Sequence, residues 1–154
     1  MVDSDMLFNH RIIEDLLKTA DPESAPFVGG LCFAVNEKFG QYPVLYQNLL
    51  GMPAVMFDVP AGIAKVDATG AALTLQHRTL FENFRRDDPH EWYHYRRVTG
   101  FDGKHEGGIL GEDLSWCWHL RDHDVPIYVD CDVEIGHVKW GVINRDTYRP
   151  NQDD

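Results

Sequence analysis

An uninterrupted apolar run at residues 27–35, FVGGLCFAV, constrains the fold more than any other feature of the sequence. Such a run is typical of a strand that is buried on both faces. Ahead of it, four apolar residues recur at helical spacing: Ile12, Ile13, Leu16 and Leu17. Asn9 is a good N-cap for this helix, and Asp21-Pro22 ends it. The pattern predicts a buried sheet that is flanked by helices.

The remaining segments continue the alternation of strands and helices. We predict a short strand in residues 1–8. Residues 65–75 should form a strand, a tight turn at Thr69-Gly70, and then a second strand or the start of a buried helix. Helices are predicted at 79–84 and 112–123, and strands at 126–130 and 132–137. Residues 37–60 and 85–108 are rich in glycine and aromatic residues. We expect an irregular binding loop at 37–60 and a mobile loop over a site at 85–108. This order predicts an α/β fold in a single domain, residues 1–150, with a frayed tail at 151–154.

Acidic residues outnumber basic ones, which limits the partners of the chain. The 154 residues include 25 Asp and Glu against 14 Lys and Arg, for a formal net charge of -11. Nucleic acids and anionic membrane surfaces are bound through cations, so we expect neither as a partner. No apolar run approaches the ~20 residues that a membrane-spanning helix requires. Three cysteines are too few for a disulfide framework, which favours a reducing, cytoplasmic location.

Three short motifs carry residues that suit metal-assisted or acid–base chemistry. Asp3 and Asp5 form a D-x-D pair, and oxygen ligands at this spacing hold Mg²⁺ or Mn²⁺ together with substrate phosphates. Glu112-Asp113 opens a predicted helix, where acids either cap the helix or supply a general base. His137 ends a predicted strand and is either a structural histidine or a metal ligand. For the acidic pairs, a solvated loop and helix capping are the plainer interpretations.

Histidines raise two further metal hypotheses. Residues 90–94 (HEWYH) match H-E-x-x-H, which on a helix places two histidines around Zn²⁺ and uses the glutamate as base. This segment lacks the apolar face of a long core helix, so a chance match is the favoured interpretation. His119 and His123 are four residues apart and able to share a metal. No C-x-x-C pair accompanies them, and we expect Cys117 to pack in the core.

Taken in order, these segments resemble the second half of a GT-A glycosyltransferase of the family-2-like kind. The motifs that carry the likeness are VDSDM, APFVGGLCFA, KVDATGAALTL and GEDLSWCWHLRDHDVPIYVDCDVEIGHV. It covers residues 2–138, and the last stretch is the most specific, with an E-D pair opening a helix, the PIYVD strand and G-H shortly after. The resemblance implies metal-dependent transfer of a sugar, with inversion, from a nucleotide-diphospho-sugar donor to a carbohydrate or other hydroxyl acceptor.

The resemblance also implies residues for the donor and the metal. Asp3 and Asp5 match the D-x-D motif that binds Mn²⁺ or Mg²⁺ and the diphosphate of the donor, with Asp5 as the direct ligand. His137 matches a histidine that joins the metal shell. Gly70 matches a turn beneath the sugar, where a side chain would collide with donor or acceptor.

Other residues are implied for the acceptor side. Asp113 matches the carboxylate that deprotonates the acceptor hydroxyl, and Glu112 matches a residue that helps to bind the acceptor. Trp92 and Tyr93 fall in the loop that contacts the acceptor, and aromatic faces suit sugar rings.

In that family, the half that holds the nucleotide precedes the D-x-D motif, which here starts at residue 3. The resemblance therefore implies a partial GT-A fold, a mixed sheet flanked by helices, whose N-terminal nucleotide-binding half is missing. We expect such a chain to need that N-terminal segment or to self-associate. Two alternatives stay open: a small zinc hydrolase built on His90, Glu91 and His94, and a non-catalytic assembly module that retains the fold.

Overall fold

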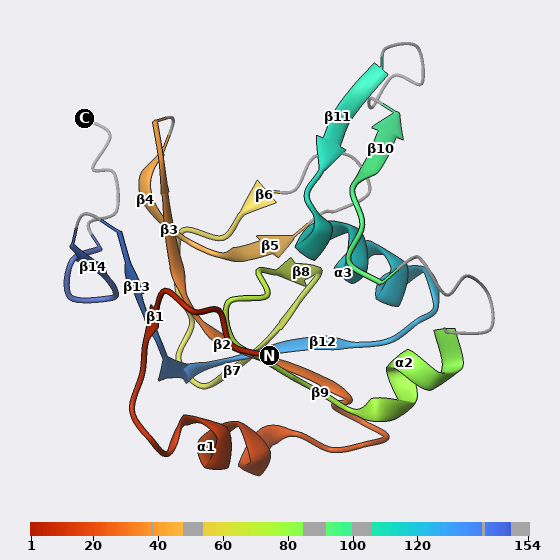
Figure 1. The fold of residues 1–154 in the computed structure, drawn as a ribbon, viewed down its shortest axis with the longest axis horizontal. Coiled ribbons are helices and arrows are strands. Elements are labelled where there is room, and N and C mark those ends of the chain that lie inside the picture. Colours follow the sequence, from red (N-terminus) through yellow and green to blue (C-terminus); the bar gives the residue numbers. More distant parts are fainter. Residues whose placement is uncertain (38, 48–53, 85–91, 100–105, 140, 149–154) are drawn as a thin grey trace.

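The computed structural model describes residues 1–37, 39–47, 54–84, 92–99, 106–139 and 141–148 (Figure 1). The helices are α1 (Ile12–Thr19), α2 (Arg78–Phe84) and α3 (Glu112–Asp122). The strands are β1 (Met6–Leu7), β2 (Phe27–Leu31), β3 (Phe33–Asn36), β4 (Gly40–Pro43), β5 (Leu45–Gln47), β6 (Ala54–Val55), β7 (Ile63–Val66), β8 (Ala68–Thr69), β9 (Thr74–Gln76), β10 (Arg96–Thr99), β11 (Glu106–Leu110), β12 (Ile127–Glu134), β13 (Gly136–Val138) and β14 (Val142–Ile143). None of the helices in these ranges combines the length and the apolarity that crossing a membrane demands. The fold is mixed α/β, as the sequence predicts.

A four-stranded mixed sheet in the order β7-β12-β2-β9 forms the centre of the fold. β12 and β2 pair in parallel, with Ile127 opposite Phe27, and β7 and β9 flank them in antiparallel orientation. Every residue of β2 is buried, which confirms the doubly buried strand predicted from its apolar run.

Helices on the two faces of this sheet complete two hydrophobic cores. α1 packs on β2, β9 and β12, and its Ile12 and Leu16 join a core with Val28. α3 lies on the opposite side of β12 (Figure 1), and its Trp116 joins a second, larger core with Phe27. Phe27 and Val28 fall in different cores because successive residues of a strand point to opposite faces.

Gly30 is the tightest point of the central sheet. A Cβ atom at this position would lie 2.5 Å from Cδ2 of Leu73 and 2.9 Å from the carbonyl oxygen of Val133. Leu73 packs under α1, and Val133 belongs to β12. The absence of a side chain at Gly30 is what allows both to approach β2 so closely.

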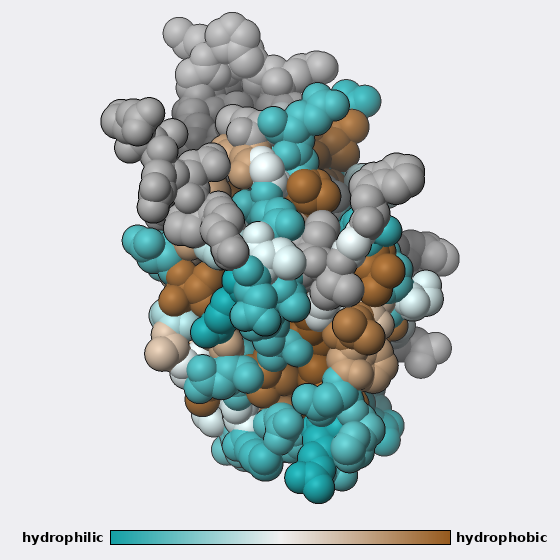
Figure 2. All heavy atoms as spheres, turned by 90° about the vertical axis from the view of Figure 1, so that its left-hand side faces the viewer, coloured by the Kyte–Doolittle hydropathy of each residue, from teal (hydrophilic) through white to brown (hydrophobic). Residues whose placement is uncertain are grey.

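Smaller sheets surround the central one. In the described ranges they are β1-β13-β14, β10-β11, β3-β4 and β6-β5-β8. β3 follows β2 after one residue, and β13 follows β12 after one residue, so both parallel strands lead into small sheets at their carboxyl ends. On the side of the molecule that carries β1, β13 and β14, apolar residues form separate patches among hydrophilic ones (Figure 2).

Helix predictions agree well with the structure. The helices predicted at 79–84 and 112–123 are confirmed as α2 and α3, and the apolar pattern at residues 12–17 is confirmed as α1. The predicted N-cap is wrong: Arg11 occupies that position, and Asn9 instead accepts the N–H of Arg11 through Oδ1. Asn9 therefore shapes the turn that leads into the helix.

Strand boundaries differ more from the predictions. The run at 27–35 breaks at Cys32 into β2 and β3, and the strands predicted at 126–130 and 132–137 regroup into β12 and β13. The segment 37–60, predicted to be an irregular loop, contains β4, β5 and β6, with Gly40 in the left-handed conformation (φ 64°) where β4 begins. In 85–108, β10 pairs with β11 in a hairpin instead of forming an irregular loop, and residues 85–91 and 100–105 lie outside the described residues. The tail 151–154 also lies outside them.

Leu16 and Leu17 form a matched pair for testing the packing of α1. Leu16 is fully buried, whereas Leu17 is 57% exposed. We expect Leu16→Ala to lower the free energy of unfolding by about 3 kcal/mol, because it deletes buried carbon atoms and leaves a cavity. Leu17→Ala should change this free energy by less than about 0.5 kcal/mol. Urea denaturation followed by circular dichroism measures both, and equal losses would contradict the orientation of α1.

Candidate active site

A cleft of about 300 Å³ lies where the chain leaves the carboxyl ends of β2 and β12. Its lining comes from six segments of the chain: Asp3 and Met6; Cys32, Phe33 and Ala34; Tyr42, Val44 and Tyr46; Ala72; Gly111, Glu112, Asp113 and Leu114; and His137. Open α/β sheets bind ligands beyond the carboxyl ends of their strands. The position of this cleft therefore makes it the candidate active site.

Four predicted site residues line this cleft together: Asp3, Glu112, Asp113 and His137. The N–H of Asp3 donates to the carbonyl oxygen of Ala72 at 3.0 Å, which fixes the N-terminal segment against the chain near β9. Antiparallel pairing of β1 with β13 sets Met6 opposite His137, so Asp5 lies beside the histidine. Backbone pairing thus brings the D-x-D motif and the G-H motif together.

Asp113 lies in the first turn of α3, yet its carboxylate accepts a hydrogen bond from outside the helix. The donor is the backbone N–H of Ala71. Burial raises the pKa of Asp113, and repulsion from Glu112 and Asp3 raises it further. A carboxylate that is held in position and partly desolvated is a better proton acceptor than an exposed one, which suits a general base.

Asp5 accepts hydrogen bonds from two cationic or potentially cationic side chains through one oxygen. His137 Nε2 lies 3.0 Å from Oδ2 of Asp5, and Lys139 Nζ lies 3.1 Å from the same oxygen. These two bonds, that from Lys139 first, hold the pKa of Asp5 below its usual value. On its other side, Nδ1 of His137 lies 3.3 Å from the carbonyl oxygen of Phe33.

Each ring nitrogen of His137 faces an oxygen atom. Nδ1 faces the carbonyl oxygen of Phe33, and Nε2 faces the carboxylate of Asp5. No group of three or more His, Cys, Asp or Glu side chains able to hold a metal occurs in the described ranges. An ion held by Asp5 and His137 would therefore take its other ligands from substrate or water.

Gly70 lies beside the candidate base. A Cβ atom there would lie 3.7 Å from Oδ2 of Asp113 and 3.1 Å from Cγ1 of Val44. The second distance is tight, so a side chain at Gly70 would push against Val44, which lines the cleft. The role of Gly70 beneath a sugar stays a prediction.

Trp92 and Tyr93 pack against the larger core, and neither lines the cleft. Trp92 makes an edge contact with Phe81 at 5.2 Å between ring centroids, and Tyr93 lies 5.7 Å from Trp116. The hydroxyl of Tyr93 accepts a hydrogen bond from Nε2 of Gln76. Their predicted contact with the acceptor stays a prediction.

Tyr42, Tyr46 and Cys32 line the cleft, although the motifs did not indicate them. Tyr42 and Tyr46 hydrogen-bond to each other, and burial raises the pKa of Tyr46. Burial raises the pKa of the Cys32 thiol to about 12, which keeps it protonated and unreactive at neutral pH. The aromatic content of segment 37–60 was the one signal in the sequence that pointed towards the two tyrosines.

A further tyrosine, Tyr95, lies one residue before the start of β10 and reaches the edge of the site. Its exposed hydroxyl donates a hydrogen bond to the carboxylate of Glu112, and this bond raises the pKa of Tyr95. The hairpin of β10 and β11 is therefore tied to the start of α3 by a side-chain contact.

The H-E-x-x-H segment does not form a helix where the structure describes it. Tyr93 has a φ of 53°, which a right-handed helix does not contain, and residues 92–95 lie outside any helix. His94 is in this non-helical stretch, while His90 and Glu91 lie outside the described residues.

His119 and His123 stand side by side near the end of α3, with their ring centroids 4.7 Å apart. The ring of Phe84 lies 4.7 Å from each of them. Cys117 is buried, and its thiol lies 3.5 Å from the carbonyl oxygen of Thr69. Its predicted place in the core is confirmed, while a metal shared by the two histidines stays a prediction.

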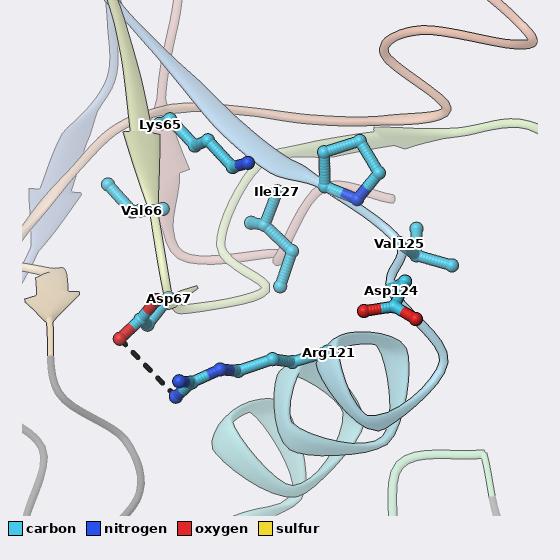
Figure 3. A pocket seen from close by; sticks show the side chains of 8 residues that line it. Lys65, Val66, Asp67, Arg121, Asp124, Val125 and Ile127 are labelled. Carbon is cyan, nitrogen blue, oxygen red and sulfur yellow. Dashed lines mark hydrogen bonds and ion pairs between the residues drawn. The ribbon is translucent and has the colours of Figure 1, made fainter.

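A second pocket, of about 190 Å³, lies at the other end of α3 and is shown in Figure 3. Arg121 extends towards Asp67, and the two form an ion pair at 3.4 Å. Lys65 and Asp124 also line this pocket, so its lining contains two basic and two acidic side chains. None of the residues predicted to carry chemistry lines this pocket, so the cleft at the start of α3 is the better candidate.

Comparison of the chain with protein-family models, with curated proteins and with solved structures finds no match. The resemblance to GT-A glycosyltransferases therefore stays a prediction, and a functional proposal depends on the geometry of the cleft.

Asp113→Asn tests the burial of the candidate base. A carboxyl whose pKa is raised by folding stabilises the protein below its unfolded pKa, and this stabilisation is lost as pH rises through the raised pKa. We expect Asp113→Asn to raise the urea midpoint relative to wild type at pH 7, where wild type buries a charge, and to give no such gain at pH 4. Asp58→Asn, at an exposed acid, is the control. A gain of equal size at both pH values would contradict the assignment.

Proposed function

We propose that this chain is the acceptor-side portion of a metal-dependent glycosyltransferase with a partial GT-A fold. It would transfer a sugar from a nucleotide-diphospho-sugar to an acceptor hydroxyl, with inversion. The observation that carries the proposal is the convergence of Asp3, Asp113 and His137 on one cleft, with Asp5 bonded to His137 from 132 positions away. Motifs short enough to occur by chance gain weight when folding brings them together.

Asp113 is the general base in this proposal. Its carboxylate takes the proton of the acceptor hydroxyl while that oxygen attacks the anomeric carbon and the nucleoside diphosphate leaves on the opposite side. The N–H of Ala71 holds the carboxylate in place, and partial burial makes it a better proton acceptor. Gly70, next to it, leaves room for the reacting sugar.

Asp5 and His137 hold Mn²⁺ or Mg²⁺ in this proposal, and Asp3 faces the diphosphate side of the same cleft. The ion supplies the positive charge that stabilises the leaving diphosphate. Asp5 offers Oδ2, and His137 offers Nε2, whose orientation is set by the bond of Nδ1 to Phe33.

The acceptor binds along the tyrosine side of the cleft. Tyr42 and Tyr46 present aromatic rings and hydroxyl groups, which suit the apolar faces and hydroxyls of a carbohydrate. Glu112, bonded by Tyr95, orients the acceptor next to Asp113. Trp92 and Tyr93 pack against the same core as Tyr46.

The nucleoside of the donor needs further surface. In the GT-A fold it binds in a half that precedes the D-x-D motif, and the proposal includes such a segment, supplied by a longer chain or by a partner.

Binding of metal and diphosphate is the first test. We expect inorganic pyrophosphate, which stands for the diphosphate of the donor, to bind wild type only in the presence of Mn²⁺. Asp5→Asn and His137→Ala should weaken this binding more than tenfold, because each removes a metal ligand. Asp58→Asn, an exposed acid outside the cleft, should bind as wild type does. Isothermal titration calorimetry measures all four proteins. Pyrophosphate binding that is absent, or that does not depend on Mn²⁺, would refute the donor site.

Transfer tests the base separately from donor binding. We expect Asp113→Asn to lower the rate of nucleoside diphosphate release from a panel of UDP- and GDP-sugars with hydroxyl acceptors by at least about a hundredfold. Its donor affinity should stay within about twofold of wild type, since the base contacts the acceptor. Glu112→Gln, a matched neighbour, should mainly raise the KM for the acceptor. Equal loss of rate and donor binding in Asp113→Asn would argue against the base role.

A further inference from the structure

The cleft carries negative charge that its described lining does not neutralise. Three carboxylates line it, those of Asp3, Glu112 and Asp113, and no lysine or arginine is among the described lining residues. The described basic side chains that form ion pairs do so with other acids. The remaining base in the lining, His137, faces Asp5, which balances any charge on its ring.

Glu112 and Asp113 lie in the first turn of α3, where the helix dipole favours acids. The dipole does not cancel their repulsion, because burial and then the charges of Glu112 and Asp3 raise the pKa of Asp113. Glu112 accepts a hydrogen bond from Tyr95, which leaves room for more, since an ionised carboxylate has about four acceptor positions. A group that donates hydrogen bonds and carries positive charge fits this carboxylate.

Aromatic side chains of the same cleft favour the same kind of ligand. Tyr42 and Tyr46 line it and hydrogen-bond to each other, and burial raises the pKa of Tyr46, so its ring stays neutral. The face of a neutral aromatic ring attracts an ammonium group and also packs against a sugar ring. The cleft volume, about 300 Å³, is that of a small-ligand site.

We infer that the acceptor of this cleft is a carbohydrate that carries a protonated amine, that Glu112 is the residue that selects it, and that carbohydrates bearing a carboxylate are excluded. The ammonium binds Glu112, and a hydroxyl of the same molecule lies next to Asp113. This inference rests on the proposed function, to which it adds a substrate class. It requires no metal ion, because the selecting charges belong to the chain itself.

The position of Glu112 sets the expected size of the preference. Its side chain is half-buried at the edge of the cleft, so water screens its charge only in part. We expect a protonated amine to tighten binding about three to ten times relative to a hydroxyl at the same carbon. A carboxylate at that carbon should weaken binding by at least about threefold, because it is repelled by the acids of the cleft.

Matched sugars test this inference on the full chain, with EDTA present and no nucleotide. In the gluco, galacto and manno series, each methyl glycoside is compared with the forms whose primary hydroxyl is replaced by an amine or oxidised to a carboxylate. Titrations followed by saturation-transfer difference NMR give the affinities. We expect the order amine, neutral, acid in each series that binds. Added salt should narrow the preference, because the cleft is open to solvent.

Variants identify the selecting residue. Glu112→Gln removes the charge and keeps the shape, so the amine and neutral forms should bind it with affinities within about twofold of each other. Glu14→Gln makes the same change at an exposed acid of α1 outside the cleft lining, and should keep the wild-type preference. Thermal melts check that both variants are folded.

The inference would be overturned by equal affinity for the amine and neutral forms, by tighter binding of the acid, by a preference that survives in Glu112→Gln, or by no binding of any sugar at millimolar concentration. Failure of the proposed function looks different. An amine preference that depends on Glu112, in a chain that shows no Mn²⁺-dependent pyrophosphate binding, would refute the glycosyltransferase proposal and leave the amine site standing. Mn²⁺-dependent pyrophosphate binding without an amine preference would do the reverse.

Discussion

The parallel pairing of β12 with β2 is the interaction on which the rest of the structure depends. It joins residues from the first and last thirds of the chain, and its strands are covered by α1 on one face and by α3 on the other. Burial on both faces means that a shift in register would expose a core. Because both strands end at the same edge of the sheet, the segments that follow them, with Cys32 and His137, meet there. The cleft is thus a consequence of the pairing.

Electrostatics then determine what that cleft is able to do. Asp3, Glu112 and Asp113 gather in it, in a chain that is already strongly acidic. Burial, and then repulsion from nearby carboxylates, raise the pKa of Asp113, while Lys139 and His137 lower the pKa of Asp5. The same site therefore holds one carboxylate disposed to take a proton and one disposed to stay ionised next to a cation. Two carboxylates with divergent environments are a recurrent arrangement where proton transfer and charge stabilisation are both required.

Local patterns predicted local structure, and the failures have physical causes. The helical spacing of the apolar residues from Ile12 to Leu17 correctly predicted α1, and the acidic pair before Leu114 correctly predicted the start of α3. Both signals are local, because helical periodicity depends on neighbours in sequence. The β10–β11 hairpin was missed because glycines hid its strand pattern. Trp92 packs against Phe81, a tertiary contact that no local pattern encodes, and its contact with an acceptor stays a prediction. Lys139 was missed because its contact with Asp5 spans almost the whole chain, which no local pattern encodes.

The packing around Gly30 limits which amino acids can replace it while the fold is kept. With a backbone carbonyl of Val133 on one side and Leu73 on the other, any added carbon would have to push β12 and Leu73 away from β2. A side chain at this position requires both neighbours to shift, whatever the residues of the cleft are. We therefore expect a distant relative that has lost all activity to keep a glycine there, because the requirement comes from packing and not from function.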